Sequence, residues 1–302
     1  MTAGELLRVQ PEVAEALAAG RGVVALESTI ISHGLPTDSA AEVAGRIEDA
    51  VRESGAVPAT IAVLDGEVRV GLDQAALDRV ATDPAVAKAS IRDLGQVLAA
   101  RGAGATTVAS TAYLAHLAGI GVFATGGLGG VHRGARESYD ESADLFALAT
   151  TPITVVSSGV KSILDVPATL ERLETLSVAV VCYRTDRFPG FYVRDSGSPA
   201  PWRLDNAADI AAVMAQRRRL ALPQALLVAN PIPATDEMRR DLHDSTLAAG
   251  LAALASAALA GSAVTPFLLD YFHEHTRGAS LAANVALVLS NARLAGALAV
   301  AG

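Results

Sequence analysis

The chain has 302 residues, of which 51% are hydrophobic and only 4% aromatic, so it can bury a large core built from small aliphatic side chains. Its net charge of −8 at pH 7 excludes a broadly basic nucleic-acid-binding surface, and no nucleic-acid partner is expected. The single cysteine, Cys182, excludes an intrachain disulfide and is typical of a reducing compartment, so a cytoplasmic location is expected.

Helix-like and strand-like segments alternate along most of the chain. Capping residues, glycine stops and apolar periodicity predict helices at 11–20, 38–54, 73–82, 92–101, 107–117, 142–148, 165–175 and 206–219. Short apolar runs predict strands at 22–26, 60–64, 67–71, 121–124, 153–157, 178–182 and 225–228, with a hairpin turn at Asp65-Gly66. Loops are expected at 27–36, around Lys88 and at 183–204.

Everything after about Thr235 is expected to be helical. Apolar stretches there, such as 245–260, approach the length of a membrane span, but Gly, Ser and polar residues interrupt them. They predict buried helices, and no membrane partner is expected. The alternation of strands and helices predicts a largely parallel or mixed sheet covered on both faces, and no linker or composition shift marks a domain boundary.

Lysine is unusually rare. The chain has 22 arginines but only two lysines, Lys88 and Lys161. Arginine serves wherever a surface cation is needed, whereas only a lysine can lose its proton in a desolvated site and attack a carbonyl. Lys161 follows a predicted buried strand and has apolar neighbours on both sides, which indicates a nucleophile. Lys88 lies among small residues before a predicted helix, where it could hold a phosphate or be an ordinary exposed lysine.

Two polar segments follow other buried strands, where α/β sheets place their sites. Glu27 ends an apolar run, so burial should raise its pKa and suit it to general acid/base catalysis, although a capping or salt-bridged carboxylate has the same pattern. The glycine-rich segment 125–134, TGGLGGVHRG, could bring backbone amides close to an anion. Asp140 and Asp144 follow it, and a carboxylate there could bind a hard cation, while Ser142 fits an ordinary helix N-cap.

Several catalytic classes are disfavoured by missing motifs. The glycine-rich segment lacks the Gly-Lys-Ser/Thr ending of a P-loop and matches the dinucleotide-binding fingerprint poorly. The six histidines show no zinc-protease spacing, and no Gly-x-Ser-x-Gly elbow is present.

Taken together, the segments resemble the pseudouridine-5′-phosphate glycosidases, also called the indigoidine synthase A-like family. The resemblance spans nearly the whole chain in the correct order. The matching segments include ALESTIISHGLP (25–36), PATIAVLDG (58–66), AKASIRDL (87–94), GATTVASTAYLAHLAGIGVFATGGLGGVHRG (104–134), DESADL (140–145), GVKSILDVPATLERLET (159–175), YRTDRFPGFY (183–192), LVANPIP (227–233) and GASLAANVALVLSNA (278–292). The chain departs from the family pattern at 37–40, a departure that concerns the entrance loop and the base accepted.

The resemblance implies a fold and a reaction. The fold implied is a three-layer α/β/α sandwich with a mixed, largely parallel sheet, forming one domain over residues 1–302 and assembling as a homotrimer with one Mn²⁺ per subunit. The reaction implied is the reversible cleavage of pseudouridine 5′-phosphate to uracil and ribose 5-phosphate at a C–C glycosidic bond. Such a bond has no leaving oxygen to protonate, so a lysine imine with ring-opened ribose suits it better than a pair of carboxylates.

The resemblance also assigns roles by position. Lys161 would be the nucleophile and Glu27 the proton donor, and Asp140 would support the metal. The residues implied to contact substrate are Lys88, Val108, Ser142, Ala143 and Asp144, with Thr125, His132 and Asn284 as further pocket candidates. Three alternatives remain at this point: a related C-nucleoside phosphate or indigoidine precursor as substrate, a sugar-phosphate kinase, and a catalytically silent binding protein.

Overall fold

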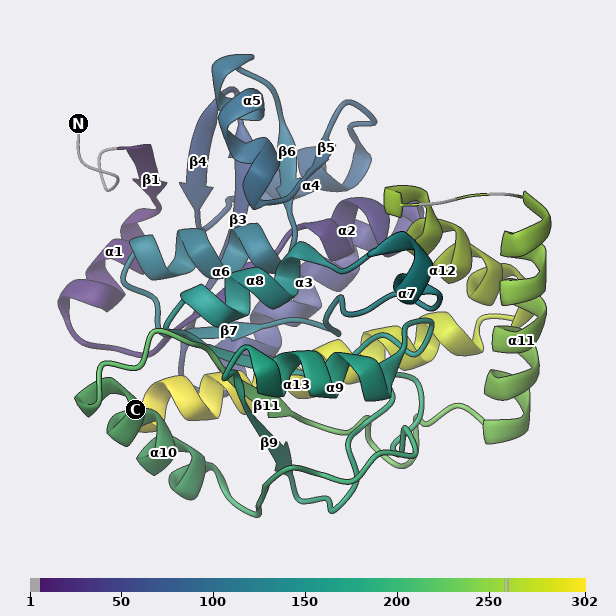
Figure 1. Cartoon of the computed structure of the whole chain (residues 1–302). Helices are drawn as coiled ribbons and strands as arrows, with labels where there is room; N and C mark the ends of the chain where they lie inside the picture. Colours follow the sequence, from purple (N-terminus) through teal and green to yellow (C-terminus); the bar gives the residue numbers. More distant parts are fainter. Residues whose placement is uncertain (1–5, 258, 260) are drawn as a thin grey trace.

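Eleven strands form one sheet through the centre of the protein in the computed structural model, which describes residues 6–257, 259 and 261–302 (Figure 1). Nine strands follow one another in the order β1-β4-β3-β2-β7-β8-β11-β9-β10, while β6 pairs with β3 and β5 pairs with β6. The strands are β1 Leu7–Val9, β2 Val23–Glu27, β3 Val57–Leu64, β4 Glu67–Val70, β5 Ala87–Ala89, β6 Gly104–Thr106, β7 Val122–Ala124, β8 Thr154–Ser157, β9 Ala179–Tyr183, β10 Arg203–Leu204 and β11 Leu226–Ala229.

Most neighbouring strands are parallel, because helical crossovers connect them and bury both faces of each strand. Strand β3 is the exception, since it pairs antiparallel with β4 and with β6. The β3–β4 hairpin turns at Asp65 and Gly66, whose φ values of 56° and 76° are those that a tight two-residue turn requires. The expected mixed, largely parallel sheet is therefore confirmed.

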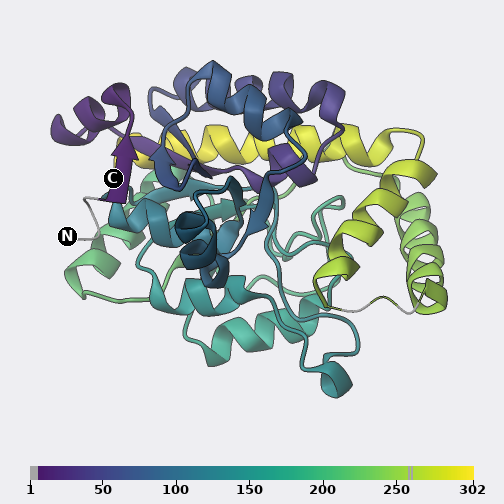
Figure 2. The same cartoon turned by 90° about the horizontal axis from the view of Figure 1, so that it is seen from above.

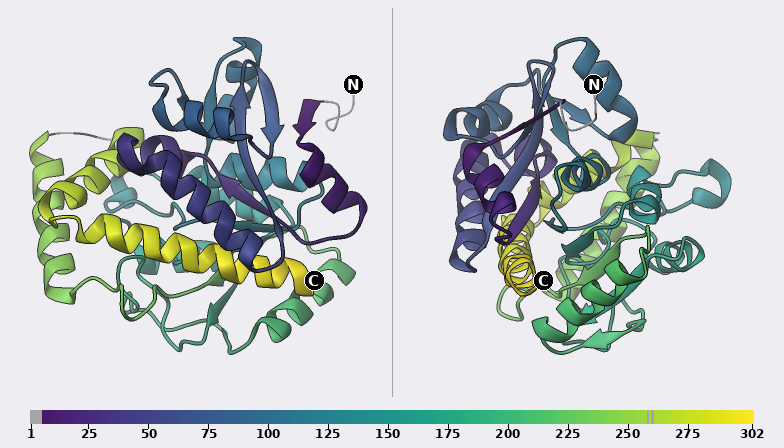
Figure 3. Two further views of the ribbon diagram at one scale, coloured as in Figure 1. Left: turned by 180° about the vertical axis from the view of Figure 1, so that it is seen from behind. Right: turned by 90° about the vertical axis from the view of Figure 1, so that its left-hand side faces the viewer.

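Helices cover both faces of this sheet. On one face α3 and α13 lie side by side, as the view from behind in Figure 3 shows, and α6, α8 and α9 lie on the other face (Figure 1). The helices are α1 Pro11–Ala18, α2 Thr29–His33, α3 Thr37–Glu53, α4 Gln74–Thr82, α5 Leu94–Ala99, α6 Val108–Leu117, α7 Ala135–Ser138, α8 Ala143–Thr150, α9 Val166–Thr175, α10 Ala207–Arg219, α11 Arg240–Ala257, α12 Val264–His275 and α13 Ala279–Ala301. The three-layer α/β/α architecture is thus confirmed, and the single domain over 1–302 stays a prediction.

Side-chain caps explain where several helices begin. Asp73 accepts the amide of Ala76 at the start of α4, and Asp165 accepts the amide of Ala168 at the start of α9. Ser142 caps α8 in the same way, as its sequence position predicted.

Some short elements differ from the sequence prediction. The segment predicted as the loop 27–36 contains the helix α2, and Lys88 lies on the strand β5 instead of in a loop. Strands β1, β6 and β10 and the helix α7 were not predicted, and the chain between Thr235 and Arg239 is not helical. Segments of two to five residues are too short to show a period, so the sequence pattern could not identify them.

The helices α11, α12 and α13 make up most of the chain from Arg240 onward. Seen from above in Figure 2, α11 and α12 pack side by side at the end of the molecule away from the termini. Residues 258 and 260, which the helical prediction also included, lie outside the described residues. Within the described part of the chain, α13 alone is long and apolar enough to span a membrane, but 56% of its apolar window is buried against α3, α10 and the sheet.

Candidate active site

A cleft of about 820 Å³ opens at the carboxyl ends of the central strands. Glu27 is the last residue of β2, Thr125 follows β7, and Lys161 follows β8, and these three strands are consecutive in the sheet. The sequence-predicted residues that line the cleft are Glu27, Lys88, Val108, His132, Asp140, Ser142, Ala143, Asp144 and Lys161. Asn284 lines a recess of about 50 Å³ that continues from the cleft past Glu27 and Lys161, and Thr125 lies behind Glu27.

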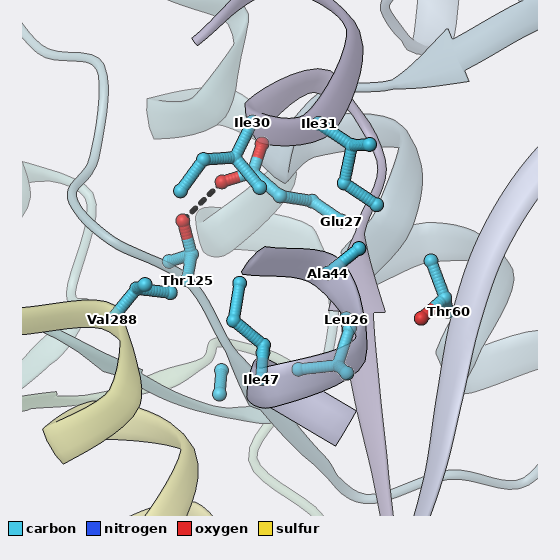
Figure 4. Close-up of a pocket in the computed structure, with 10 residues that line it drawn as sticks. Leu26, Glu27, Ile30, Ile31, Ala44, Ile47, Thr60, Thr125 and Val288 are labelled. Carbon is cyan, nitrogen blue, oxygen red and sulfur yellow. Dashed lines mark hydrogen bonds between the residues drawn. The ribbon is translucent and has the colours of Figure 1, made fainter. Parts of the chain in front are cut away.

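Glu27 combines burial with a hydrogen bond from the Thr125 hydroxyl. Its carboxyl accepts the hydroxyl of Thr125 and lies between the cleft and an apolar pocket that includes Ile30, Ile47 and Val288 (Figure 4). Burial raises the pKa of Glu27, while the charge of Lys161 and the Thr125 hydroxyl act in the opposite direction. The carboxyl is therefore suited to hold a proton and to release it to a group bound in the cleft.

The two lysines share this cleft with Glu27 and Asp144. Burial lowers the pKa of Lys88, the charge of Lys161 lowers it further, and Asp144 and Glu27 partly restore it. Lys88 is held on β5 opposite Ala105 of β6, so its position is fixed by the sheet. The end of β2 thus carries an acid, and the loop after β8, with β7 between the two strands, carries an amine, while a second amine lies across the cleft.

The loop that carries Lys161 is joined to the glycine-rich segment. The Leu128 amide donates to the Gly159 carbonyl at 2.9 Å, and the Lys161 amide donates to the Leu128 carbonyl at 3.1 Å. Gly159 has a φ of 81°, and a Cβ there would lie 2.3 Å from the Pro189 carbonyl oxygen, so only glycine fits. The two loops that follow β7 and β8 are therefore held against each other.

Asp144 closes the site on the other side. Its carboxylate accepts the Ala109 amide at 3.0 Å and the Gly129 amide at 2.8 Å, so it ties the start of α6 to the glycine-rich segment. A Cβ at Gly129 would lie 2.3 Å from the Ser142 hydroxyl oxygen, which explains the glycine. Asp144 was predicted to contact substrate, and the structure places both of its oxygens on backbone amides.

The glycine-rich segment differs from a phosphate-binding loop. Its amides at Leu128, Gly129, Val131 and His132 each donate to an acceptor within the protein. The expectation that these amides cradle an anion is therefore wrong for this part of the segment. The first residues of α6 and α8 line the cleft instead, and helix N-termini attract anions.

The expected metal residue lies at the rim of the cleft. The Asp140 carboxylate is 3.6 Å from Nδ1 of His132, and burial lowers the pKa of that histidine, with Asp140 opposing the shift. Over the described residues, no three His, Cys, Asp or Glu side chains are grouped as metal ligands. One carboxylate suits a hydrated hard cation, which keeps most of its waters, so Asp140 fits such an ion and not a fully protein-coordinated one.

Sequence reasoning missed Asn291, which is fully buried on α13 behind the site. Its amide donates to the Thr125 carbonyl at 2.9 Å and to the Ser158 hydroxyl at 3.1 Å. Asn284 and Asn291 are seven positions apart in an apolar helix, so they share its buried face. A polar pair at that spacing on a buried stripe is the signal that could have identified Asn291.

Comparisons with known proteins identify the family of this chain. A family model described as "Indigoidine synthase A like protein" matches residues 12–301. A pseudouridine-5′-phosphate glycosidase of Salinispora tropica is 56% identical over 98% of this chain and 91% of its own length, and one of Paracoccus denitrificans is 53% identical over 98% of each chain.

Two solved structures share the fold. The prealnumycin C-glycosynthase AlnA in complex with ribulose 5-phosphate superposes with a TM-score of 0.91 at 41% identity, covering 98% of this chain and 97% of that one. An indigoidine synthase A-like protein of Thermotoga maritima gives a TM-score of 0.89 at 35% identity, covering 99% and 97%.

Proposed function

This chain belongs to the indigoidine synthase A-like family, and from that premise we propose that it cleaves pseudouridine 5′-phosphate to uracil and ribose 5-phosphate through an imine on Lys161. The observation that carries the proposal is the placement of Lys161 and the buried carboxyl of Glu27 in one cleft, after two strands of the same sheet. The full-length relatives that carry the glycosidase name support the substrate.

The proposed chemistry assigns one task to each side chain. The Lys161 amine bonds to C1′ as the bond between C1′ and the ring oxygen breaks, and the proton that the nitrogen loses is taken by that oxygen. The bond between C1′ and C5 of uracil then breaks. Its electron pair stays on C5, which takes the proton of Glu27, and an iminium remains between C1′ and Lys161. Water hydrolyses the iminium, which releases the aldehyde of ribose 5-phosphate and restores the amine.

The remaining cleft residues anchor the sugar phosphate. Lys88 and the first residues of α6 and α8 provide positive charge and helix N-termini for the 5′-phosphate. Val108, Ser142 and Ala143 line this part of the cleft, and Asp144 fixes it through backbone amides. Thr125, His132 and Asn284 complete the pocket walls.

We also propose one Mn²⁺ per subunit, held by Asp140 through a hydrated shell, where it would neutralise phosphate charge. The protein is further proposed to work as a cytoplasmic homotrimer, which the family resemblance supports. Sedimentation velocity at micromolar concentration tests the trimer, and a monomer under all conditions would contradict it.

The synthetic direction gives a direct test of the activity. Incubation of the protein with Mn²⁺, uracil and ribose 5-phosphate is expected to yield pseudouridine 5′-phosphate, detected by its mass and by its resistance to acid hydrolysis. Absence of product under every divalent cation tried would contradict the proposed function.

Borohydride trapping tests the nucleophile. Reduction in the presence of ribose 5-phosphate is expected to add one pentitol phosphate to the protein, and peptide mapping has only two lysines to distinguish. Lys161→Ala should abolish the adduct, whereas Lys88→Ala should still form it at higher substrate concentration. An unchanged adduct in Lys161→Ala would show that the nucleophile is assigned wrongly.

A second candidate substrate is a related C-glycoside phosphate, because the C-glycosynthase shares both fold and 41% identity. Competition between pseudouridine 5′-phosphate and other C-linked ribose phosphates would rank them by kcat/KM.

A further inference from the structure

Asn291 joins the ends of three neighbouring strands. Its side-chain amide donates to the Thr125 carbonyl at 2.9 Å and more weakly to the Gly126 carbonyl at 3.3 Å, both just after β7. The same amide donates to the Ser158 hydroxyl at 3.1 Å, just after β8. Its side-chain oxygen accepts a hydrogen bond at 2.9 Å from the side-chain amide of Asn230, which lies just after β11. Strands β7, β8 and β11 are consecutive in the sheet, so one side chain spans all three ends.

The segments that Asn291 holds are those that carry the site. Thr125 donates its hydroxyl to Glu27, and Gly126 lines the recess beside Glu27 and Lys161. Ser158 begins the turn that leads to Lys161, and its own amide donates to the Gly126 carbonyl at 2.9 Å. Through these bonds the segments that carry Lys161 and the partner of Glu27 are both anchored to Asn291 on α13.

Asn291 does not touch the cleft. It has no exposed surface, and it lines none of the recesses around Glu27 and Lys161. A buried amide with all its bonds satisfied is rigid, because loss of any partner leaves a polar group unpaired in the core. Such a network can fix the distance between two catalytic groups that lie on different strands.

We propose that Asn291 is a positioning residue that sets the geometry between Glu27 and Lys161 by clamping the strand ends that carry Thr125 and Ser158. This proposal rests on the proposed function of those two residues. Catalytic groups that shift by about 1 Å can lose two orders of magnitude in rate, so the clamp should matter for the chemical step more than for substrate binding.

The test compares Asn291→Ala with the neighbouring change Ser290→Ala. Ser290 accepts a second hydrogen bond from Asn230 at 3.0 Å but makes no bond to Thr125, Gly126 or Ser158. Asn291→Ala is expected to lower kcat roughly 10- to 100-fold with KM changed less than about threefold, measured at a temperature where circular dichroism shows both variants folded. Ser290→Ala should keep kcat within about twofold of the wild type.

Asn291→Asp provides a second measurement if the alanine variant does not fold. It keeps the side-chain volume and the acceptor for Asn230, but a carboxylate donates no hydrogen bond and a protonated carboxyl only one, so it cannot hold both Thr125 and Ser158, and kcat should again fall at least about tenfold. Wild-type kcat in a folded Asn291 variant would overturn the proposal. Failure of both variants to fold would also overturn it, since Asn291 would then serve the fold as a whole. An inactive wild type in the same assay would instead refute the proposed function.

Discussion

Glu27 is the residue whose environment most directly supports a chemical role. Its carboxyl accepts the Thr125 hydroxyl and lies between the apolar pocket of Figure 4 and the cleft that holds Lys161. Glu27→Gln keeps the size and the hydrogen bond but cannot donate a proton, so kcat should fall about 10²- to 10⁴-fold. Steady-state kinetics in the synthetic direction measures this. The variant should still form the borohydride-trapped adduct through Lys161, and loss of the adduct would place Glu27 in a different step.

The pH dependence follows from the same environment. Burial is the main cause that raises the pKa of Glu27, and the charge of Lys161, the Thr125 hydroxyl and Lys88 lower it, while Asp144 raises it. Activity that requires the protonated acid is lost as pH rises through this pKa. Thr125→Val removes a donor that stabilises the carboxylate, so the pKa should rise and the alkaline limb of kcat/KM should move to higher pH. Thr125→Ser keeps the hydroxyl, so its alkaline limb of kcat/KM should stay at the wild-type pH. A shift of this limb to lower pH in Thr125→Val would contradict the predicted direction of the pKa change.

The sequence identified candidate site residues that belong to a rare type or that end an apolar strand. Lys161 and Lys88 were identifiable because lysine is nearly absent, and Glu27 because it ends an apolar strand. Asn291 was not, because its importance lies in carbonyls and hydroxyls of distant loops that only the folded sheet brings together. The role of Asp144 as a clamp for backbone amides was hidden for the same reason.

Among the elements, the glycine-rich segment has a function that its composition did not reveal. Its glycines allow close packing against side chains, such as the approach of Gly127 to the Phe191 ring, where a Cβ would lie 2.6 Å from a ring carbon. Composition alone suggested an anion-binding loop, because both roles need the absence of a Cβ. The strands β5 and β6 illustrate a related limit, since each has three residues and exists through its pairing with the other and with β3.

Gly129→Ala tests the packing role of this segment. The added Cβ would meet the Ser142 hydroxyl oxygen at 2.3 Å and the Asp144 carboxylate at 2.8 Å, so the clamp between α8 and the segment must shift. We expect a loss of about 1–3 kcal/mol of stability and at least about a tenfold loss of kcat/KM. Gly121→Ala is the matched control, because nothing lies within 4 Å of its Cβ position just before β7. Equal effects of the two changes in thermal unfolding and kinetics would contradict the packing argument.

For the molecule as a whole, the order and type of the long elements were predictable because apolar periodicity and caps act locally. The sheet order was not predictable, since it depends on which strands pair across the helical crossovers.

The helical end formed by α11, α12 and α13 adds a feature that sequence patterns do not report. His243 of α11 is buried against Phe272 of α12, with ring centroids 5.7 Å apart.

This buried histidine predicts how stability depends on pH. Nδ1 of His243 bonds to the Asp244 carboxylate at 2.8 Å, and Nε2 is buried without a partner among the described residues. Burial lowers the pKa of His243 below its usual 6.5, although Asp244 opposes the shift. The unfolded chain therefore binds more protons than the native one just below pH 6.5. The stability that the neutral His243 contributes is therefore fully present above pH 6.5 and is lost as pH falls. The free energy of unfolding then changes with a limiting slope of about 1.4 kcal/mol per pH unit for one proton.

His243→Phe isolates this contribution from the others. Burial also lowers the pKa of His33 and His132, which act in the same direction, and raises that of Glu27 and Glu48, whose contributions decrease as pH rises above about 4.5. Urea denaturation from pH 8 to pH 5 measures the free energy of unfolding of both proteins. As pH falls, this free energy should decrease more for the wild type than for His243→Phe, because only the wild type loses the contribution of His243. His116→Phe, at an exposed position of α6, should leave the wild-type slope unchanged. A difference between His243→Phe and wild type that is constant over this range would mean that the buried ring takes up its proton as readily in the native protein as in the unfolded chain.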